Sequence, residues 1–328
     1  MSTASSTRIP LLILVGPTAS GKTDLLLELF ASGQFPALRK DREAEVVSAD
    51  SMQAYRGMDI GTAKPGQELR AFLPHRLIDI LEPTEQYTAG DFVGFADAAI
   101  DEIVQSGRTP IISGGTGFYV RNFVFGLPEA PRADPAIRAA VQAEFESRGA
   151  APLRDELAAG DPDSARRIHA NDTYRLTRAV EILRATGRPM GDFAAPTSPR
   201  ERYDFLLVEL TRPRAELCSR IDARVDAMFE AGLPAEVEAL KARGIGPEAP
   251  GMKAIGYREF FESTDAHSEQ VTRERIKQNT RHYAKRQETF FASLPGLVRI
   301  EAGEGAAERL ASLAEPFFGR RTKPSPRL

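Results

Sequence analysis

Eight residues near the amino terminus have the types and spacing of a phosphate-binding loop. Residues 16–23 fit the pattern G-x-x-x-x-G-K-[ST] in full, between an apolar run and a helical pattern. Glycines there let backbone N–H groups turn inward around a phosphate, and the following helix presents its positive end to the same anion. Lys22 would neutralise the anion, and the Thr23 hydroxyl would ligate Mg²⁺. We expect a diphosphate-containing ligand to be bound by Gly16, Pro17, Thr18, Ala19, Ser20, Gly21, Lys22 and Thr23.

This loop pattern does not identify the ligand. Most such loops bind ATP or GTP, but the guanine-recognition motif N-K-x-D does not occur in the sequence. Residues 91–94 fit the motif D-x-x-G, but they open a helical pattern and have no partner motif, so we treat the match as a coincidence. No run of four apolar residues ends in an Asp that would hold Mg²⁺, and Asp79, after Leu77 and Ile78, comes nearest.

Two other polar residues follow predicted strands. Asp50 comes after the second strand of the chain, and Thr116 comes after the fourth. Ligands of open parallel sheets bind at the carboxyl ends of the strands, so both residues are expected to face the phosphate loop. A carboxylate beside a diphosphate can bind Mg²⁺ through water or act as a general base. On its own, Asp50 is about equally consistent with a helix cap.

The elements that must position these residues alternate between strands and helices. Short apolar runs predict strands at residues 11–15, 44–49, 76–80, 109–113 and 205–210. Helical patterns follow the phosphate loop to residue 30 and extend over residues 89–105. This order implies a parallel sheet that is covered by helices on both faces. We therefore predict an α/β fold, a P-loop NTPase-like parallel sheet with flanking helices.

The middle of the chain has a different pattern. Residues 134–188 are rich in Ala and Arg, with helical spacing and no convincing strand. Asn171 and Asp172 offer a cap at the start of one helix within this segment, and Gly187 and Pro189 end it. A helical block between strands of one sheet is best explained as an insertion. We predict an all-helical insertion domain at residues 128–202, within a catalytic core formed by residues 8–127 and 203–328.

The two ends of the core carry further local signals. From about residue 214 to about residue 293 the chain is expected to be mostly helical. The last residues, with Pro324 and Pro326, are expected to form a frayed tail. A charged run at residues 39–45 follows Pro36, and we expect this stretch to form a surface loop.

Composition and charge agree with a protein of about two domains, since the chain has 328 residues. Hydrophobic residues make up 42% and charged residues 27%, so a sizeable core can form and global disorder is excluded. No apolar run approaches the ~20 residues of a membrane span and no signal peptide is visible, so we expect a soluble, cytoplasmic protein. The single cysteine, Cys218, cannot form an internal disulfide. The net charge of −3 argues against indiscriminate nucleic-acid binding but leaves room for local basic patches.

Five segments resemble, in order, those of bacterial tRNA dimethylallyltransferases. They are residues 16–23, 48–65, 114–119, 167–172 and 256–258. The similarity extends from about residue 11 to about residue 291, and the segments that contain Asp50 and Thr116 are specific to this family. Plant-type adenylate isopentenyltransferases share the phosphate loop, but they would not explain the helical insertion and the carboxyl-terminal helices.

The resemblance implies transfer of a dimethylallyl group from dimethylallyl diphosphate to N6 of adenosine-37, next to the tRNA anticodon. The phosphate loop would then hold the diphosphate of this donor together with Mg²⁺. Lys22, the loop amides and Mg²⁺ would stabilise the charge on the departing diphosphate. The family match makes Asp50 the base that accepts the N6 proton and Thr116 the residue that orients the reacting centre. It also favours Arg220 as part of the diphosphate clamp, with Arg224 one turn further on.

An adenine must leave its stack to reach such a site, which implies base flipping. Ser51 and Gln53 resemble the groups that would recognise the extruded base. Basic residues at successive i+4 positions, from Arg273 to Lys285, form a stripe that suits an RNA backbone, although a solvated helix face could also carry it. With this stripe, the family resemblance implies that tRNA, through its anticodon stem-loop, contacts Asp50, Ser51, Met52, Gln53, Thr116, Arg138, Tyr174, Arg175, Leu176, Thr177, Arg178, Lys253, Arg258, Lys277, Arg281, Lys285, Arg286 and Gln287. Arg175 and Arg178 are also consistent with solvated helix arginines. A monomer would suit a protein that clamps one tRNA arm.

Two other functions share some of these features. A P-loop small-molecule kinase would have the same phosphate loop and parallel sheet, but it would turn over ATP and would not need the basic stripe. A nucleotide-switched RNA-binding protein would bind GTP or ATP tightly and hydrolyse it slowly. The missing base-recognition motif argues against this last alternative.

Overall fold

The computed structural model describes residues 8–30, 43–131, 134–262 and 269–319. Its residues form two compact units: the first contains the chain up to Val124 and again from Arg200, and the second is Phe125–Pro199. The proline-containing tail and most of the predicted surface loop lie outside the described residues. No helix in the described ranges is long and apolar enough to cross a membrane.

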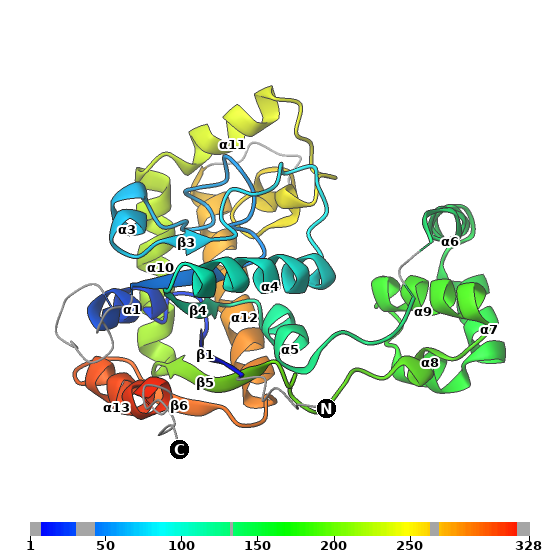
Figure 1. Ribbon diagram of the computed structural model, residues 1–328. Helices are drawn as coiled ribbons and strands as arrows, with labels where there is room; N and C mark the ends of the chain where they lie inside the picture. The colour runs from blue at the N-terminus through cyan, green and yellow to red at the C-terminus, as the bar shows by residue number, and fades with distance from the viewer. Residues whose placement is uncertain (1–7, 31–42, 132–133, 263–268, 320–328) are drawn as a thin grey trace, which may run out of the picture. The chain divides into compact units, whose positions relative to one another are not determined.

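A six-stranded sheet forms the centre of the first unit (Figure 1). Its strands are β1 (Ile9–Val15), β2 (Ala44–Ser48), β3 (His75–Arg76), β4 (Thr109–Gly114), β5 (Tyr203–Thr211) and β6 (Val298–Glu301). They lie in the order β3-β2-β4-β1-β5-β6, and every pair is parallel. The predicted α/β fold with a parallel sheet is therefore confirmed.

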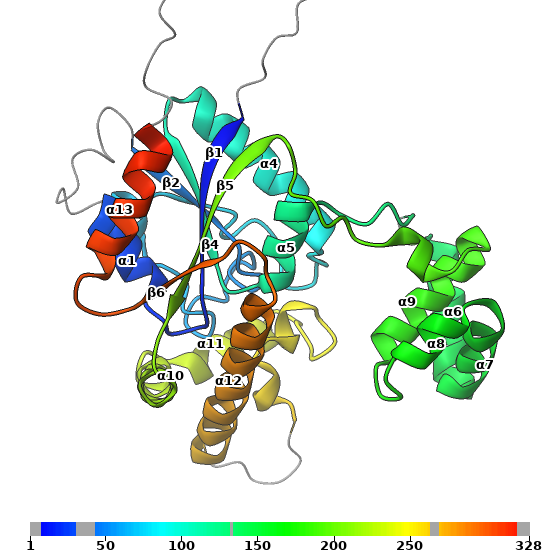
Figure 2. The ribbon, with the colours of Figure 1, turned by 90° about the horizontal axis from the view of Figure 1, so that it is seen from below.

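Helices cover both faces of this sheet. The helices of this unit are α1 (Lys22–Phe30), α3 (Gln67–Phe72), α4 (Ala89–Gln105), α5 (Gly117–Phe125), α10 (Arg214–Glu230), α11 (Leu233–Ala242), α12 (Glu269–Ala292) and α13 (Ala306–Gly319), with 3-10 turns η2 (Gly251–Lys253) and η3 (Arg258–Phe260). Figure 2 shows α1 and α13 on one side of the strands and α4 and α5 on the other. Because β1 is central and covered on both faces, its residues from Leu11 to Val15 are all apolar and fully buried.

The structure differs from the sequence prediction in three elements of this unit. The strand predicted at residues 76–80 is only the two-residue β3, because Leu77 and Asp79 have φ values of 63° and 58°, which are incompatible with a strand. Strand β6 and helix α13 were not predicted. Strand β6 pairs with β5 at the edge of the sheet, and α13 packs against the sheet; Ile300 and Leu310 of these two elements are almost fully buried in the same core.

The match to D-x-x-G at residues 91–94 has a structural cause in α4. The Thr88 hydroxyl oxygen accepts a hydrogen bond from the Asp91 N–H at 3.2 Å, and the Asp91 carboxylate accepts one from the Thr88 N–H at 3.0 Å. This reciprocal arrangement is a capping box, which starts the helix at Ala89 as predicted. Asp91 therefore serves the helix terminus.

The described part of the second unit contains helices and connecting segments but no strand. Its elements are α6 (Pro135–Arg148), α7 (Ala150–Gly160), α8 (Pro162–Arg167), α9 (Thr173–Thr186) and the 3-10 turn η1 (Met190–Phe193). A small core that includes Val141, Leu153 and Leu176 holds the helices together. As predicted, Asp172 caps α9 at its start, and Gly187 ends it in the left-handed conformation, at φ 66°.

One buried carboxylate joins two elements of this unit. Asp161 is only 2% exposed, and it accepts hydrogen bonds from the N–H of Ser164 at 3.0 Å and of Met190 at 2.8 Å. The first bond caps α8, and the second fixes the start of η1. Loss of the carboxylate would leave two backbone donors without their acceptor.

We predict that Asp161→Ala lowers the free energy of unfolding by about 2 kcal/mol, because it removes a helix cap and a buried acceptor. The matched control is Asp163→Ala, two residues further along the chain, whose exposed side chain only pairs with the exposed Arg166. That control should cost less than about 0.5 kcal/mol. Urea denaturation followed by circular dichroism measures both. Equal losses of unfolding free energy in the two variants would show that the two hydrogen bonds of Asp161 do not stabilise the fold.

Candidate functional site

The phosphate loop connects the carboxyl end of β1 to the first residue of α1. The Lys22 ammonium group is folded back onto this loop and donates hydrogen bonds to the carbonyl oxygens of Gly16 at 2.9 Å and Pro17 at 3.0 Å. Burial, together with the positive charge of Arg224, lowers the pKa of Lys22 to about 8, although Asp50 opposes this shift. The site therefore holds more positive charge than its carboxylates balance, which favours an anionic ligand.

Three arginines surround the loop from the end of β5 and from α10. Arg212 Nε donates to the Ser20 carbonyl at 2.7 Å, Arg220 Nε donates to the Ala19 carbonyl at 2.9 Å, and an Arg224 NH donates to the Thr18 hydroxyl at 3.3 Å. The sequence favoured Arg220, but the structure places Arg224, one turn further on, in the wall of the pocket. Arg212 was not predicted, and its signal is its position just after the predicted fifth strand.

Asp50 and Thr116 lie together at the ends of β2 and β4. The Thr116 hydroxyl oxygen accepts a hydrogen bond from the Ser51 N–H at 3.0 Å, and the Thr116 N–H donates to the Ala49 carbonyl at 3.1 Å. Gly114 makes this approach possible, because a Cβ there would lie 2.2 Å from the Ala49 carbonyl oxygen. The two predicted site segments are thus hydrogen-bonded to each other.

A pocket of about 150 Å³ brings Asp50 together with the phosphate loop. Its lining includes Lys22, Thr23 and Arg224 from the loop and α10, with Asp50 and Gln53 from the chain after β2. Burial raises the pKa of the Asp50 carboxyl. Hydrogen bonds from the N–H groups of residues 52 and 53, and the charges of Lys22 and Arg224, act in the opposite direction. Asp50 is therefore a more basic carboxylate than an ordinary aspartate, facing a cationic cradle.

Helix α12 contributes two further residues to this pocket, Tyr283 and Gln287. The Gln287 side chain is 5% exposed; its oxygen accepts from the Thr18 N–H at 2.9 Å, and its nitrogen donates to the Gly115 carbonyl at 2.8 Å. Gln287 was predicted to contact tRNA, but here its amide links the phosphate loop to the chain before Thr116. Tyr283 was not predicted; burial, with a smaller contribution from the charge of Asp50, raises its pKa to about 12.

The chain after Asp50 forms one wall of the pocket through Thr62, Ala63 and Pro65. Glu236 of α11 holds the segment before them: its carboxylate accepts hydrogen bonds from the N–H groups of residues 59, 60 and 61 at 2.8 to 3.2 Å. The same carboxylate accepts the Tyr257 hydroxyl at 2.6 Å. Four donors on one carboxylate fix this wall, and no local pattern around Glu236 in the sequence marks this role.

The predicted tRNA-contacting residues of the first unit differ in burial and in the partners of their side chains. Ser51, Met52 and Gln53 are half-buried, and the Gln53 amide donates to the carbonyls of residues 62 and 63, each at 3.4 Å. Farther along the chain, Lys253 is exposed, with a long ion pair of 3.8 Å to Glu248. The half-exposed Arg258 pairs with two carboxylates, at residues 259 and 262.

In the second unit, the predicted tRNA-contacting residues separate into exposed and structural positions. Arg138 and Arg175 are exposed, and Tyr174 is an aromatic ring with 74% of its surface open to solvent. Leu176, by contrast, is fully buried in the core of the unit, so its side chain is unavailable to RNA. Arg178 pairs with Glu181 at 3.0 Å. The Thr177 hydroxyl donates to the carbonyl of residue 174 at 3.1 Å.

The basic stripe of α12 is placed differently from the prediction. Lys277 lies 2.8 Å from the carboxylate of Asp226, and Arg281 pairs with Asp222, both on α10. The stripe is therefore an ion-paired helix interface for most of its length, and contact of Lys277 and Arg281 with tRNA stays a prediction. Lys285 and Arg286 are exposed, as a tRNA-contacting role requires.

The protein offers few ligands of its own to a metal ion. Within the described ranges no group of three or more His, Cys, Asp or Glu side chains could hold one. Thr23 and Asp50 nevertheless line the same pocket as the phosphate loop. A hydroxyl and one carboxylate fit Mg²⁺, which takes most of its ligands from substrate phosphates and water.

Comparisons with known proteins agree with this geometry. Residues 53–294 match the family described as IPP transferase. The tRNA dimethylallyltransferase 1 of Trichlorobacter lovleyi is 43% identical over 94% of this chain and 98% of its own, and the tRNA dimethylallyltransferase of Geobacter sulfurreducens is 40% identical over 97% and 100%. A full-length tRNA isopentenylpyrophosphate transferase from Bacillus halodurans superimposes with a TM-score of 0.67 at 35% identity, covering 95% of this chain and 98% of that one. A eukaryotic dimethylallyltransferase acting on tRNA gives 0.78 at 26% identity, covering 97% and 82%. The chain belongs to the IPP transferase family of tRNA dimethylallyltransferases.

Proposed function

We propose that this protein transfers the dimethylallyl group of dimethylallyl diphosphate to N6 of adenosine-37, next to the tRNA anticodon, and so forms N6-dimethylallyladenosine. The observation that carries the proposal is one pocket in which the cationic phosphate loop faces a carboxylate, Asp50, whose pKa is raised by burial. The membership of the chain in a family of tRNA dimethylallyltransferases supplies the donor and the acceptor.

The diphosphate would be bound by the phosphate loop, residues 16–23. Lys22 and Arg224 are cationic side chains in the pocket wall. Arg220 binds the loop itself, through its hydrogen bond to the Ala19 carbonyl. Mg²⁺, held by the Thr23 hydroxyl and by diphosphate oxygens, would neutralise charge on the leaving group. Since all these groups come from one chain, a monomer suffices for the reaction.

Asp50 would act as the general base. The N6 nitrogen of the adenine forms a bond to C1 of the dimethylallyl group while the C1–O bond breaks, and the electron pair of that bond leaves with the diphosphate. The N6 proton passes to the Asp50 carboxylate. Thr116 keeps Asp50 in place through its bond to the backbone of Ser51, and Lys22 and Arg224 stabilise the charge that develops on the departing oxygen.

The acceptor adenine would enter the pocket as an extruded base. Ser51, Met52 and Gln53 immediately follow Asp50 and are half-buried, so they are positioned to recognise its edge. In the second unit, the exposed Tyr174 offers a ring on which a nucleobase can stack, and the exposed Arg175 offers charge to phosphates. These roles separate base recognition from backbone binding.

Transfer of radiolabel tests the function directly. The protein is incubated with Mg²⁺, unmodified tRNA and dimethylallyl diphosphate that carries the label, and the nucleosides are then analysed. We expect label in N6-dimethylallyladenosine at position 37. A parallel incubation with labelled ATP tests the kinase alternative. Phosphoryl transfer to a small molecule without any label in tRNA would replace the proposed function by that alternative.

We predict that Asp50→Asn lowers the turnover number by about 10²- to 10⁴-fold, because the amide cannot accept the N6 proton. The amide oxygen can still accept the N–H groups of residues 52 and 53, so the local fold is kept. Affinity for tRNA should stay nearly unchanged, since most of it comes from phosphate contacts. Single-turnover kinetics and filter binding measure the two quantities. Unaltered turnover would remove Asp50 from the role of base.

We also predict a pH dependence that is set by the charges around Asp50. The base must be ionised, so kcat/KM falls as the pH drops through the pKa of Asp50, which lies above the usual aspartate value of about 3.9 because of burial. Arg224→Gln removes a positive charge that favours the carboxylate, so the acid limb should move to higher pH. The remote control Arg309→Gln, on α13, should leave the limb in place. A limb that Arg224→Gln leaves unmoved would contradict this account.

A further inference from the structure

The six basic residues of α12 fall into two groups with different surroundings. Arg273, Lys277 and Arg281 face α10 and pair with its carboxylates, Asp222 and Asp226. Arg275, Lys285 and Arg286 form no ion pair with any residue in the described ranges. The helix therefore uses half of its basic residues to pack against α10, and the other half have no ion-pair partner in the described part of the chain.

The three basic residues that lack an ion pair within the described ranges lie on one face of the helix. Arg275, Gln278, His282, Lys285 and Arg286 are all exposed. Steps of three and four residues lead from Arg275 through Gln278 to His282, and Lys285 and Arg286 follow His282 by three and four residues, so all five lie on one stripe. We call this stripe the outer face of α12. Its length from Arg275 to Arg286 is about 16 Å, at ~1.5 Å per residue. A row of exposed donors of this length and single sign matches a polyanion better than a small ligand.

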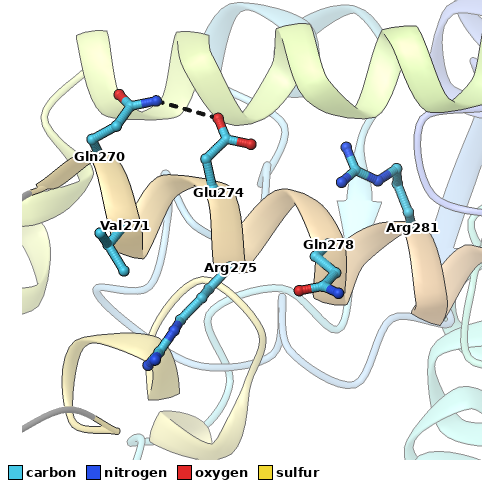
Figure 3. Close-up of a pocket in the computed structure, with 6 residues that line it drawn as sticks. All are labelled: Gln270, Val271, Glu274, Arg275, Gln278 and Arg281. Carbon is cyan, nitrogen blue, oxygen red and sulfur yellow. Dashed lines mark hydrogen bonds between the residues drawn. The ribbon is translucent and has the colours of Figure 1, made fainter.

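A hollow on the surface lies at the first part of the outer face. It measures about 390 Å³ and is lined by Gln270, Val271, Glu274, Arg275, Gln278 and Arg281. In Figure 3, the side chains of Arg275 and Gln278 extend to the side of α12 that is away from α10. The nearby Glu274 does not cancel this charge, because its carboxylate accepts from Lys277 at 3.2 Å and is bonded to Gln270 as well.

The other end of the outer face reaches the reaction pocket. The Arg286 guanidinium lies 5.7 Å from the ring centroid of Tyr283, and Tyr283 lines the pocket beside Asp50. A nucleotide whose base enters the pocket must continue into its own backbone at the pocket rim. The outer face begins at that rim and runs away from it along α12.

We infer that the outer face of α12 binds the phosphate backbone of the tRNA strand that leads away from the extruded adenosine. Arg forks and Lys ammonium groups bind phosphate oxygens without regard to base sequence, so this surface sets position and affinity rather than sequence choice. Arg275 and Gln278, in the hollow, are new to the proposed interface. The inference rests on the proposed function, because it takes tRNA as the substrate whose base enters the pocket.

Arg275→Gln tests the inference, with tRNA affinity measured between about 50 and 200 mM salt. Loss of one phosphate contact should reduce the slope of log K against log salt by about 0.7 to 0.9. Arg275→Lys, which keeps the charge, should retain most of the slope. Turnover at saturating tRNA should stay at the wild-type value, because Arg275 is about 16 Å along the helix from Arg286, the outer-face residue at the pocket rim. The control Arg309→Gln, on α13, should not change the slope.

Each outcome separates the inference from the proposed function. A wild-type slope for Arg275→Gln, in a protein that prenylates tRNA, would show that the outer face does not bind RNA. The same would follow if Arg309→Gln reduced the slope equally, since the effect would then come from total charge. A wild-type protein that transfers no label to tRNA would overturn the proposed function instead. A slope reduced only in Arg275→Gln would still identify an RNA-binding face.

Discussion

Parallel pairing of β2, β4 and β1 is the constraint on which the site depends. Because the three strands run in one direction, their carboxyl ends at Ser48, Gly114 and Val15 meet at one edge of the sheet. The phosphate loop, Asp50 and Thr116 each follow one of these ends, so three segments far apart in sequence become neighbours. The absence of a side chain at Gly114 is part of the same constraint, since only then can the chain after β2 and the chain before Thr116 approach closely.

The charged side chains at this edge shift each other's pKa values. Burial makes both Lys22 and Arg224 harder to ionise, and neighbouring positive charges add to the effect, so the pKa of both is lowered. The pKa of Asp50 is raised by burial, so neither charge type is fully stabilised by the protein alone. A diphosphate would supply the missing negative charge to the cations and would favour their protonated forms. The cradle is thus built for an anion that the folded chain does not provide.

Local sequence patterns predicted part of this arrangement. The phosphate loop, strands β1, β2, β4 and β5 and helix α4 each have a pattern that is visible within a short stretch of sequence, such as the continuous apolar run of β1. Parallel pairing also predicted that Asp50 and Thr116 face the phosphate loop. The individual side-chain contacts between other distant elements were not predicted. The i+4 spacing of Lys277 and Arg281 identifies one face of α12 but not its neighbour, whereas Asp222 and Asp226 on α10 repeat the same spacing and were the overlooked signal. Likewise, nothing local indicates that Gln287 contacts Thr18 across 269 residues.

These contacts give α12 three distinct sides. One side is held against α10 by ion pairs, and α10 also carries Arg220 and Arg224, which touch the phosphate loop. A second side supplies Gln287 to the loop itself. Because both attachments end at the same loop, the helix and the cradle are fixed relative to each other before any ligand arrives. The third side is the outer face of α12, which therefore lies at a fixed distance from Asp50. An RNA strand bound there would already hold its extruded base next to the pocket.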